Sequence, residues 1–490
     1  MSAVVIGLDQ GTSSTRCLAL DERMRIVGSG AVPVSCSFPG PGRVEQDPDE
    51  LAASAERAIA AALREAGVGA NDVAALGIAS QTETFVVCER ASGRPIHPAV
   101  VWQDRRTTDR CRALAAVGHA RLVRDRTGLE LDPTFSATKL AEVLDGVDGA
   151  RERARAGSLV FHDIAGWLIR SLAGIDVCDV GNAGRTLLCG LGAGDWDDEL
   201  LALFDVPRGL MPPIVDTDGV GGVCLPESAI AGVRLTATLG DQQASLLGLG
   251  CLERGQAKLT LGTGAFLLVQ VGEEAIPSPD GVLQSCAWRL RGRASYAAEG
   301  FIPAAGSALD WFAAAGIAPA PAELDALLAD AGAEDGSIAC VPALQGFGTP
   351  SWDPDIRAGL LGMTRATTRA ELAGALVDGV VHQVVDALEA IGSKIPLSSV
   401  IVDGGLARSE WVLRRLADLG RVEVRRAVRG EATAVGAALA AGLAVGRWGF
   451  GDLGGAETDL VMTPAMSEGE RAARRGRWAE AVEVVGSWRR

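Results

Sequence analysis

The chain begins with a pattern of apolar and polar residues that is typical of a β-hairpin. Residues 4–8 are an apolar run, residues 9–15 form a small polar turn, and residues 17–20 are again apolar. Asp21 ends the second run. Two apolar runs joined by a short turn predict a pair of antiparallel strands.

The same order of segments recurs in the second half of the chain. Residues 258–261 and 265–269 are strand-like runs, and the turn at residues 262–264 consists of Gly, Thr and Gly. A second hairpin is therefore predicted here. Its recurrence predicts two halves of related architecture.

A helix and a strand are predicted after the first hairpin. Asp47 followed by Pro48 is a common helix start, because Asp caps free backbone N–H groups and proline fits the first helical position. Residues 51–66 have helical periodicity and are followed by Gly67, a common helix end. Residues 73–78 are strand-like.

The second half alternates in the same way. Residues 400–402 are strand-like, residues 403–405 are Asp-Gly-Gly, and residues 409–419 are helical. Strands that alternate with helices predict an α/β fold.

The length of the chain favours more than one domain, because 490 residues exceed what one hydrophobic core usually supports. A glycine-rich stretch at residues 248–255 lies just before the second hairpin. We therefore predict an N-terminal domain at residues 1–250, a C-terminal domain at 251–450 and a C-terminal helical tail at 451–490. Residues 468–490 resemble a charged amphipathic helix, for which a solvated helix is favoured over a binding tail.

Composition disfavours several classes of function. There are 62 acidic and 46 basic residues, and the net charge of −16 opposes binding to nucleic acids and anionic membranes. No apolar run approaches the roughly 18 residues of a membrane span, and no signal-peptide pattern is present. The ten cysteines contain no C-x-x-C pair and only four histidines accompany them, which disfavours zinc and predicts reduced thiols in a cytoplasmic protein. A metal would then be a hard cation such as Mg²⁺.

Two turns rich in Gly, Thr and Ser are candidate phosphate-binding sites. The chain has neither a Walker-type G-x-x-x-x-G-K-[ST] loop nor a G-x-G-x-x-G loop that opens a helix. Backbone N–H groups and hydroxyls at residues 9–16 and 262–264 can converge on an anion, since small residues leave room for it. Taken singly, each turn also fits ordinary turn chemistry. Two such turns at the starts of two α/β halves favour a nucleotide site.

Asp241 is a candidate catalytic residue. It follows the strand-like residues 235–239 and precedes a helix of small residues. Open α/β sheets bind their ligands at the carboxyl ends of their strands. A helix N-cap is the alternative, because Asp caps helices well. Both interpretations stay open at this point.

A series of short motifs occurs in a fixed order along most of the chain. The motifs lie at residues 7–12, 101–107, 131–139, 182–186, 195–198, 240–243, 262–264 and 403–405. Together they resemble the FGGY family of carbohydrate kinases, and within it the glycerol kinases most closely. The resemblance implies two ribonuclease-H-like domains, of the actin-like ATPase type, that close over a central cleft.

The resemblance also implies ligands for ATP and Mg²⁺. The implied ATP-binding residues are Thr12, Ser13, Arg16, Gly262, Thr263, Gly306, Gly404, Gly405 and Ser409. Asp9 and Asp241 are the implied metal ligands, and Asp241 is also the implied general base, which takes the proton of the attacking hydroxyl. FGGY kinases more often have Asn at the place of Ser409.

A small polyol is the implied acceptor, with glycerol the first candidate. The implied acceptor-binding residues are Thr82, Glu83, Trp102, Thr134, Asp241, Gln242 and Phe266. A carboxylate accepts hydrogen bonds from hydroxyls while aromatic faces cover the carbon chain, although core packing is the alternative for Trp102 and Phe266. Thr82 and Thr134 stand where glycerol kinases usually have Arg and Tyr, which predicts a longer acceptor pocket.

The predicted activity is the transfer of the γ-phosphoryl group of ATP to a hydroxyl of a small polyol. One alternative is an FGGY kinase for a tetritol, a pentitol or a ketose such as xylulose. The other is an actin-like or Hsp70-like ATPase that phosphorylates nothing, since a shared fold does not fix a function. Glu83, Trp102 and Gln242 argue against the ATPase. We expect a homo-oligomer, a dimer or tetramer, without nucleic-acid or membrane partners.

Overall fold

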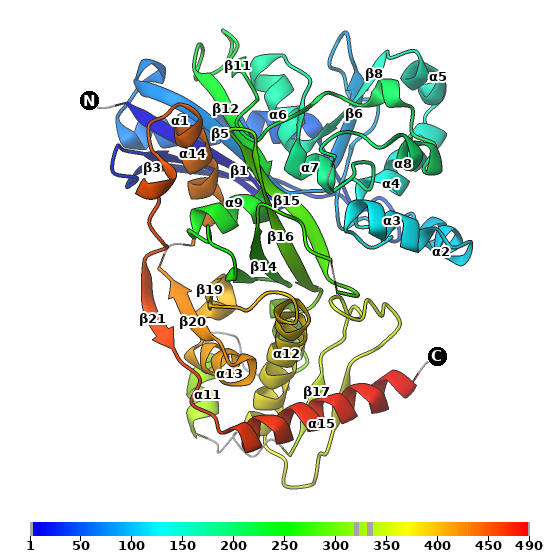
Figure 1. Cartoon of the computed structure of the whole chain (residues 1–490), viewed down its shortest axis with the longest axis vertical. Coiled ribbons are helices and arrows are strands. Elements are labelled where there is room, and N and C mark those ends of the chain that lie inside the picture. The colour runs from blue at the N-terminus through cyan, green and yellow to red at the C-terminus, as the bar shows by residue number, and fades with distance from the viewer. Residues whose placement is uncertain are drawn as a thin grey trace.

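Two β-sheets, one in each half of the chain, organise the molecule (Figure 1). The computed structural model describes residues 3–191, 193–277, 279–317, 323–330, 337–428 and 430–488. The first sheet has the strand order β11-β12-β5-β1-β2-β3. Its strands are β1 (Val4–Gln10), β2 (Ser14–Leu20), β3 (Ile26–Pro33), β5 (Val73–Ser80), β11 (Gly222–Val223) and β12 (Arg234–Gly240). Strands β1, β5 and β12 are parallel, whereas β2 is antiparallel to both β1 and β3.

The second sheet has the strand order β15-β16-β14-β13-β19-β20-β21. Its strands are β13 (Gln256–Leu261), β14 (Ala265–Gly272), β15 (Leu283–Leu290), β16 (Arg293–Ile302), β19 (Ser399–Asp403), β20 (Glu423–Ala427) and β21 (Thr458–Met462). Strands β13, β19 and β20 are parallel, and β14 is antiparallel to both β13 and β16.

The two sheets share one topology. Three antiparallel strands are followed by two parallel ones, in the orders β3-β2-β1-β5-β12 and β16-β14-β13-β19-β20. Both predicted hairpins are confirmed as β1–β2 and β13–β14. The predicted α/β class and the related architecture of the two halves are confirmed, and the strand order is that of ribonuclease-H-like, actin-like ATPase domains.

The helices of the first half include the predicted helix after the first hairpin, α1 (Pro48–Ala66). The carboxylate of Asp47 accepts a hydrogen bond from the backbone N–H of Asp49 at 2.9 Å, and Gly67 ends the helix with a φ of 67° that favours glycine. The other helices are α2 (Thr108–Ala116), α3 (His119–Thr127), α4 (Ser136–Gly146), α5 (Ala150–Arg155), α6 (Ile164–Ala173), α7 (Val180–Gly184), α8 (Asp198–Leu203) and α9 (Asp241–Gly248). The short strands are β4 (Glu45–Gln46), β6 (Phe85–Glu89), β7 (Ala99–Val100), β8 (Leu159–Asp163), β9 (Cys178–Asp179) and β10 (Ile214–Val215).

The second half contains helices of very different length. The helices are α10 (Gly306–Ala314), α11 (Leu324–Asp330), α12 (Arg369–Gly392), α13 (Glu410–Gly420), α14 (Ala432–Ala444) and α15 (Glu468–Ser487). A short pair of strands is formed by β17 (Ala339–Val341) and β18 (Gly359–Leu361). The predicted helix at residues 409–419 is confirmed as α13, and Ser409 is its N-cap.

Helix α14 returns from the second half and packs on the first sheet, where it contacts α9, β1 and β5 (Figure 1). Glycines allow this close approach. A Cβ on Gly436 would lie 1.8 Å from the carbonyl oxygen of Ala244, and a Cβ on Gly7 would lie 2.0 Å from that of Ala434. The halves are therefore joined by packed helices as well as by the chain near residue 250. The boundaries at residues 250 and 450 stay predictions.

The C-terminal helix packs on the second half, which corrects the expectation of a solvated helix at residues 468–490. Strand β21 lies at the edge of the second sheet. The expected helix is present as α15, but its face with Trp478, Ala481 and Val485 is buried against neighbours that include β17 and α12. Apolar residues spaced by three or four positions share one helix face, and this face packs instead of remaining in solvent.

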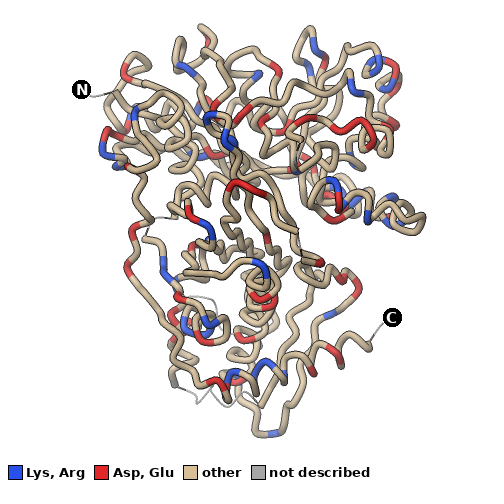
Figure 2. Tube along the Cα trace, viewed as in Figure 1, with Lys and Arg blue, Asp and Glu red and all other residues tan. Residues whose placement is uncertain are grey.

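Charged residues of both signs are spread over the molecule, and the cysteines agree with the sequence-based expectation. Figure 2 shows Lys and Arg interspersed with Asp and Glu along both halves of the trace. Among the helices that the structure describes, none is long and apolar enough to cross a membrane. All ten cysteines are unpaired, and nine of them are buried, as expected for reduced thiols.

Candidate active site

The candidate site lies where the parallel strands of the first sheet end. The strand register pairs Ser80 of β5 with Gln10 of β1 on one side and with Gly240 of β12 on the other. The residues just beyond these positions, among them Gln81 and Asp241, therefore gather at one edge of the sheet. This is the edge at which open α/β sheets bind ligands.

Asp241 is the first residue of α9 and is not its N-cap, so the capping interpretation is wrong. The N-cap is Gly240, which has no side chain to cap with. The Asp241 carboxylate accepts hydrogen bonds from the backbone N–H and the side-chain amide of Gln242, at 2.7 and 3.3 Å. The pKa of Asp241 is raised to about 6, mainly by burial and also by the Glu83 carboxylate, whereas the Lys258 ammonium opposes the shift. A carboxylate with such a pKa is suited to accept a proton near neutral pH.

Asp9 is the second ionisable group at this edge. Burial raises its pKa to about 7, and the neighbouring carboxylate of Asp241 adds to the shift, whereas Arg16 opposes it. Two carboxylates that repel each other form an oxygen-rich place for a hard cation. Among the residues that the structure describes, no group of three His, Cys, Asp or Glu could hold a metal ion.

The β1–β2 turn is closed by a backbone hydrogen bond, and its Thr12 hydroxyl is hydrogen-bonded within the protein. The backbone N–H of Gly11 donates to the carbonyl oxygen of Ser14 at 3.0 Å. The Thr12 hydroxyl donates to Gln81 Oε1 at 3.1 Å and accepts from the indole N–H of Trp102 at 3.0 Å. Thr12 thus connects the turn to Trp102, one of the expected acceptor-binding residues. The exposed Arg16 is held near the second half by Glu431, at 3.4 Å.

The β13–β14 turn presents backbone where the first turn presents side chains. The N–H of Gly262 donates to the carbonyl oxygen of Gly264 at 2.9 Å, and the N–H of Gly306 donates to the carbonyl oxygen of Gly262 at 2.9 Å. The carbonyl oxygen of Thr263 accepts from the N–H of Ser307 at 3.0 Å. A Cβ on Gly306 would lie 2.5 Å from the Gly262 oxygen, so only glycine fits there. The structure therefore brings together three of the expected ATP-binding residues.

Gly404 and Gly405 lie at the end of β19, beside the same turn. Gly404 has a φ of 94°, and a Cβ there would lie 2.5 Å from the carbonyl oxygen of Leu261. The role of Ser409 in ATP binding stays a prediction. Its hydroxyl accepts from the N–H of Val412 at 3.2 Å and donates to Asp325, so this side chain is occupied in capping α13.

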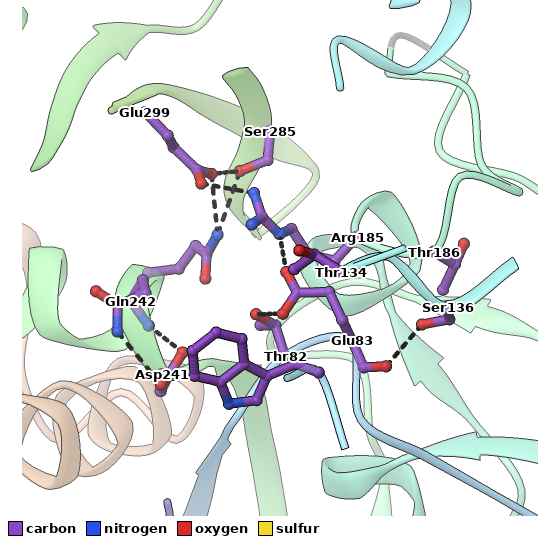
Figure 3. A network of polar contacts seen from close by, with 12 residues as sticks. Thr82, Glu83, Thr134, Ser136, Arg185, Thr186, Asp241, Gln242, Ser285 and Glu299 are labelled. Atoms are coloured by element: carbon purple, nitrogen blue, oxygen red, sulfur yellow. Dashed lines mark hydrogen bonds and ion pairs between the residues drawn. The ribbon is translucent and has the colours of Figure 1, made fainter. Parts of the chain in front are cut away.

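Glu83 is buried and held from three sides (Figure 3). Arg185 Nε donates to its Oε1 at 2.6 Å, and the Thr82 hydroxyl donates to its Oε2 at 2.7 Å. The Ser136 hydroxyl donates to its carbonyl oxygen at 3.0 Å. Its φ of 62° lies in the left-handed region, which a residue with a side chain adopts only where its surroundings hold it.

The two expected aromatic residues meet from opposite halves. The ring centroids of Trp102 and Phe266 are 6.3 Å apart at an interplanar angle of 78°.

The Thr134 hydroxyl donates to Asp132 Oδ1 at 2.6 Å and accepts from Arg105 at 3.1 Å. Because the hydroxyls of Thr82 and Thr134 already donate within the protein, neither has a hydrogen to offer to a longer polyol.

Two buried cations of the site were not predicted from the sequence. Lys258 is fully buried, and its ammonium donates to Gln242 Oε1 and, at 3.1 Å, to the Thr260 hydroxyl. Burial lowers its pKa, while the nearby carboxylates of Asp403 and Asp241 oppose the shift. A lysine inside a strand pattern is the one signal that the sequence offers for it. Arg185 lies within one of the ordered motifs, but nothing in the sequence indicates its partners.

Two family models match the chain. The N-terminal domain of the FGGY family of carbohydrate kinases matches residues 4–248, and the C-terminal domain of that family matches residues 257–445. A glycerol kinase of Alkalilimnicola ehrlichii is 41% identical over 99% of this chain and 99% of its own length. A glycerol kinase of Thermus brockianus is 42% identical with the same coverage.

Solved structures agree with this assignment. The crystal structure of Plasmodium falciparum glycerol kinase with ADP superposes with a TM-score of 0.92 at 26% identity, covering 99% of this chain and 98% of that one. A xylulose kinase of Rhodospirillum rubrum has a TM-score of 0.85 at 24% identity over 99% of both chains, which shows the shared fold. The chain therefore belongs to the FGGY family of carbohydrate kinases.

Proposed function

We propose that this chain transfers the γ-phosphoryl group of ATP to a terminal hydroxyl of glycerol and so produces glycerol 3-phosphate. The observation that carries the proposal is that the carboxylates of Asp241 and Glu83 lie near each other (Figure 3), and the rings of Trp102 and Phe266 contact each other across the two halves. Full-length relatives at 41–42% identity bear the name glycerol kinase. A cytoplasmic location and assembly as a dimer or tetramer stay predictions.

The nucleotide would lie against the second half. The turn formed by Gly262, Thr263 and Gly306 would bind the donor phosphates, because its glycines have no side chains that would keep an anion away from the backbone. Gly404 and Gly405 would let adenosine lie against bare backbone. From the first half, Thr12, Ser13 and Arg16 would approach the transferred phosphate, with the Arg16 guanidinium as the charged group.

Asp241 would act as the general base. The acceptor hydroxyl gives its proton to the Asp241 carboxylate while its oxygen forms the new bond to the γ-phosphorus. The bond from that phosphorus to the β,γ-bridging oxygen breaks, and ADP leaves with that electron pair. Phosphoryl transfer depends mainly on positioning and charge neutralisation, so one well-placed base suffices.

Glu83 would hold the other hydroxyls of the acceptor. Each of its carboxylate oxygens accepts one hydrogen bond from the protein, and each keeps a lone pair for a hydroxyl. Trp102 and Phe266 would cover the carbon chain, which suits a small amphipathic ligand.

Asp9 and Asp241 fit Mg²⁺. Their carboxylates lie close enough for Asp241 to raise the pKa of Asp9, and a divalent cation would relieve this repulsion. Mg²⁺ is commonly held by one or two carboxylates together with water and substrate phosphates. When bound, it would neutralise charge on the phosphates.

An acceptor panel tests the proposal. The chain is incubated with ATP and Mg²⁺ plus glycerol, erythritol, xylitol, xylulose or no acceptor, and phosphorylated products are identified by mass spectrometry. We expect ADP release to require an acceptor and glycerol 3-phosphate to form with the highest kcat/KM. A preference for a longer acceptor would replace glycerol with that compound. Equal ADP release without any acceptor would favour the ATPase alternative.

A further inference from the structure

One guanidinium joins two carboxylates that belong to opposite halves of the molecule (Figure 3). Arg185 Nε donates to Glu83 Oε1 at 2.6 Å, and Arg185 Nη1 donates to Glu299 Oε2 at 2.5 Å. Glu83 follows β5 of the first sheet, whereas Glu299 lies on β16 of the second. All three side chains are at most 10% exposed, so solvent screens this bridge little.

The environment of Arg185 fixes its orientation. The guanidinium lies over the ring of Phe135, 5.3 Å from the ring centroid. A planar fork can direct two N–H groups at two different carboxylates, which a lysine ammonium on a flexible stem does less well. The side chain therefore sets the distance between Glu83 and Glu299.

The second carboxylate is itself anchored. The Ser285 hydroxyl donates to Glu299 Oε1, and the amide of Gln243 donates to Ser285 Oγ at 3.2 Å and to Glu299 Oε1 at 3.5 Å. Gln243 lies on α9, two residues after Asp241. A continuous chain of polar contacts thus runs from Glu83 through Arg185 and Glu299 to the helix that carries Asp241.

We propose that Arg185 is a positioning residue that fixes the Glu83 carboxylate for the acceptor by anchoring it to Glu299 of the second half. This inference rests on the proposed role of Glu83 in acceptor binding. Without the guanidinium, Glu83 Oε1 loses its donor and turns toward other partners, and two buried carboxylates are left without their shared counter-charge. Acceptor binding should suffer before nucleotide binding does.

The test compares the kinetics of Arg185→Met and Glu299→Gln with those of the wild type. We expect Arg185→Met to raise KM for glycerol about 10-fold or more, because a charged hydrogen bond that places the carboxylate is lost. KM for ATP should stay within about twofold. Glu299→Gln should raise KM for glycerol by a smaller factor, although Glu299 is not placed against the acceptor. Arg185→Lys should restore part of the loss.

A matched control distinguishes positioning from a general loosening of the two halves. Arg289 of the second half pairs with Asp216 of the first, away from Glu83. Arg289→Met removes another Arg–carboxylate pair between the halves, which is more exposed than the Arg185 bridge, and should leave KM for glycerol unchanged. In the Arg185→Met background, Glu299→Gln should add no further loss, since its connection to Glu83 is already gone.

The outcomes separate this inference from the proposed function. If the wild type does not phosphorylate glycerol, the proposed function fails, and the acceptor that it does use replaces glycerol in the same comparison. If the wild type is active and Arg185→Met keeps its acceptor KM, the inference is overturned. Equal losses in Arg185→Met and Arg289→Met would overturn it too. Should Arg185→Met fail to fold in thermal unfolding, an unchanged acceptor KM in Glu299→Gln would overturn it.

Discussion

The two halves share a sheet topology but offer different chemistry to the site. The first half contributes ionisable side chains at its strand ends, namely Asp9, Glu83 and Asp241, and burial raises the pKa of Asp9 and Asp241. The second half contributes backbone at Gly262 and Gly404, and at Gly404 a side chain would collide with the chain and strain it. A general base needs a tuned pKa, whereas phosphate and adenosine need space and N–H groups. One pattern of strands can therefore carry proton chemistry on one side and nucleotide binding on the other.

The largest effect is expected from removing the base of the first half. Asp241→Asn should lower kcat by about 10² to 10⁴, as for a lost general base. The exposed Asp195→Asn is the control and should change kcat by less than about twofold. Steady-state turnover with saturating ATP and glycerol measures both. An Asp241→Asn variant with more than half of the wild-type turnover would remove Asp241 from this role.

The second-largest effect is expected on kcat/KM for acceptors of different chain length. Thr82→Arg combined with Thr134→Tyr should raise kcat/KM for glycerol by about 10- to 100-fold and lower it for four- and five-carbon polyols, since a hydrogen bond to a charged group contributes about 1.5 to 3 kcal/mol. The new side chains would shorten the pocket. The two single variants are the controls, because Thr82→Arg alone also removes the hydrogen bond to Glu83. The prediction of a longer acceptor pocket fails if the wild type already prefers glycerol strongly and the double variant shows no gain in kcat/KM for glycerol.

A smaller effect is expected when the backbone surface of the second half is disturbed. Gly404→Ala should raise KM for ATP about 10-fold with little change in kcat, because a Cβ would push Leu261 and the turn beside it. Gly446→Ala is the control. Gly446 also has a positive φ, of 71°, but a Cβ there would meet no atom within 4 Å, so only stability should fall, by about 1 kcal/mol. Similar KM values for ATP in both variants would refute the special role of Gly404.

The smallest effect is expected from Asp9→Asn, which should change the free energy of unfolding in a way that depends on pH. The pKa of Asp9 is raised to about 7 from 3.8, so the folded state binds this proton more tightly than the unfolded state. The contribution of Asp9 to stability is therefore lost as pH rises from about 4 to about 7. Without Mg²⁺, Asp9→Asn should be stabilising, by about 2 to 3 kcal/mol more at pH 8 than at pH 5. Urea unfolding at the two pH values measures this, and a pH-independent difference would show that Asp9 ionises normally in the fold.

Local features of the fold were predictable because they depend on neighbours in the sequence. The helix from Pro48 to Ala66 carries its own cap and its own glycine stop, and each hairpin carries its own turn. The packed face of α15 was missed, since its partners on β17 and α12 lie more than 70 residues away in the chain. Long-range packing of this kind has no local signal.

Site residues that lie in a sequence motif could be predicted. Site residues whose role depends on a contact with a distant part of the chain could not. The positions of Asp241 and Glu83 follow from strand ends and from the family resemblance. The links of Arg185 to Glu83 and Glu299 span 102 and 114 positions, and no spacing rule reveals them. The occupied hydroxyls of Thr134 and Ser409 likewise became visible only through their partners.

The central claim is that the first half performs the chemistry while the second half binds the nucleotide. Equilibrium titration of ADP, with Mg²⁺ present, into the wild type, Asp241→Asn and Gly404→Ala tests it most directly. The account predicts a Kd for Asp241→Asn within about twofold of the wild type and a Kd for Gly404→Ala that is about 10-fold weaker. The reverse pattern, with ADP binding lost in Asp241→Asn and intact in Gly404→Ala, would contradict it.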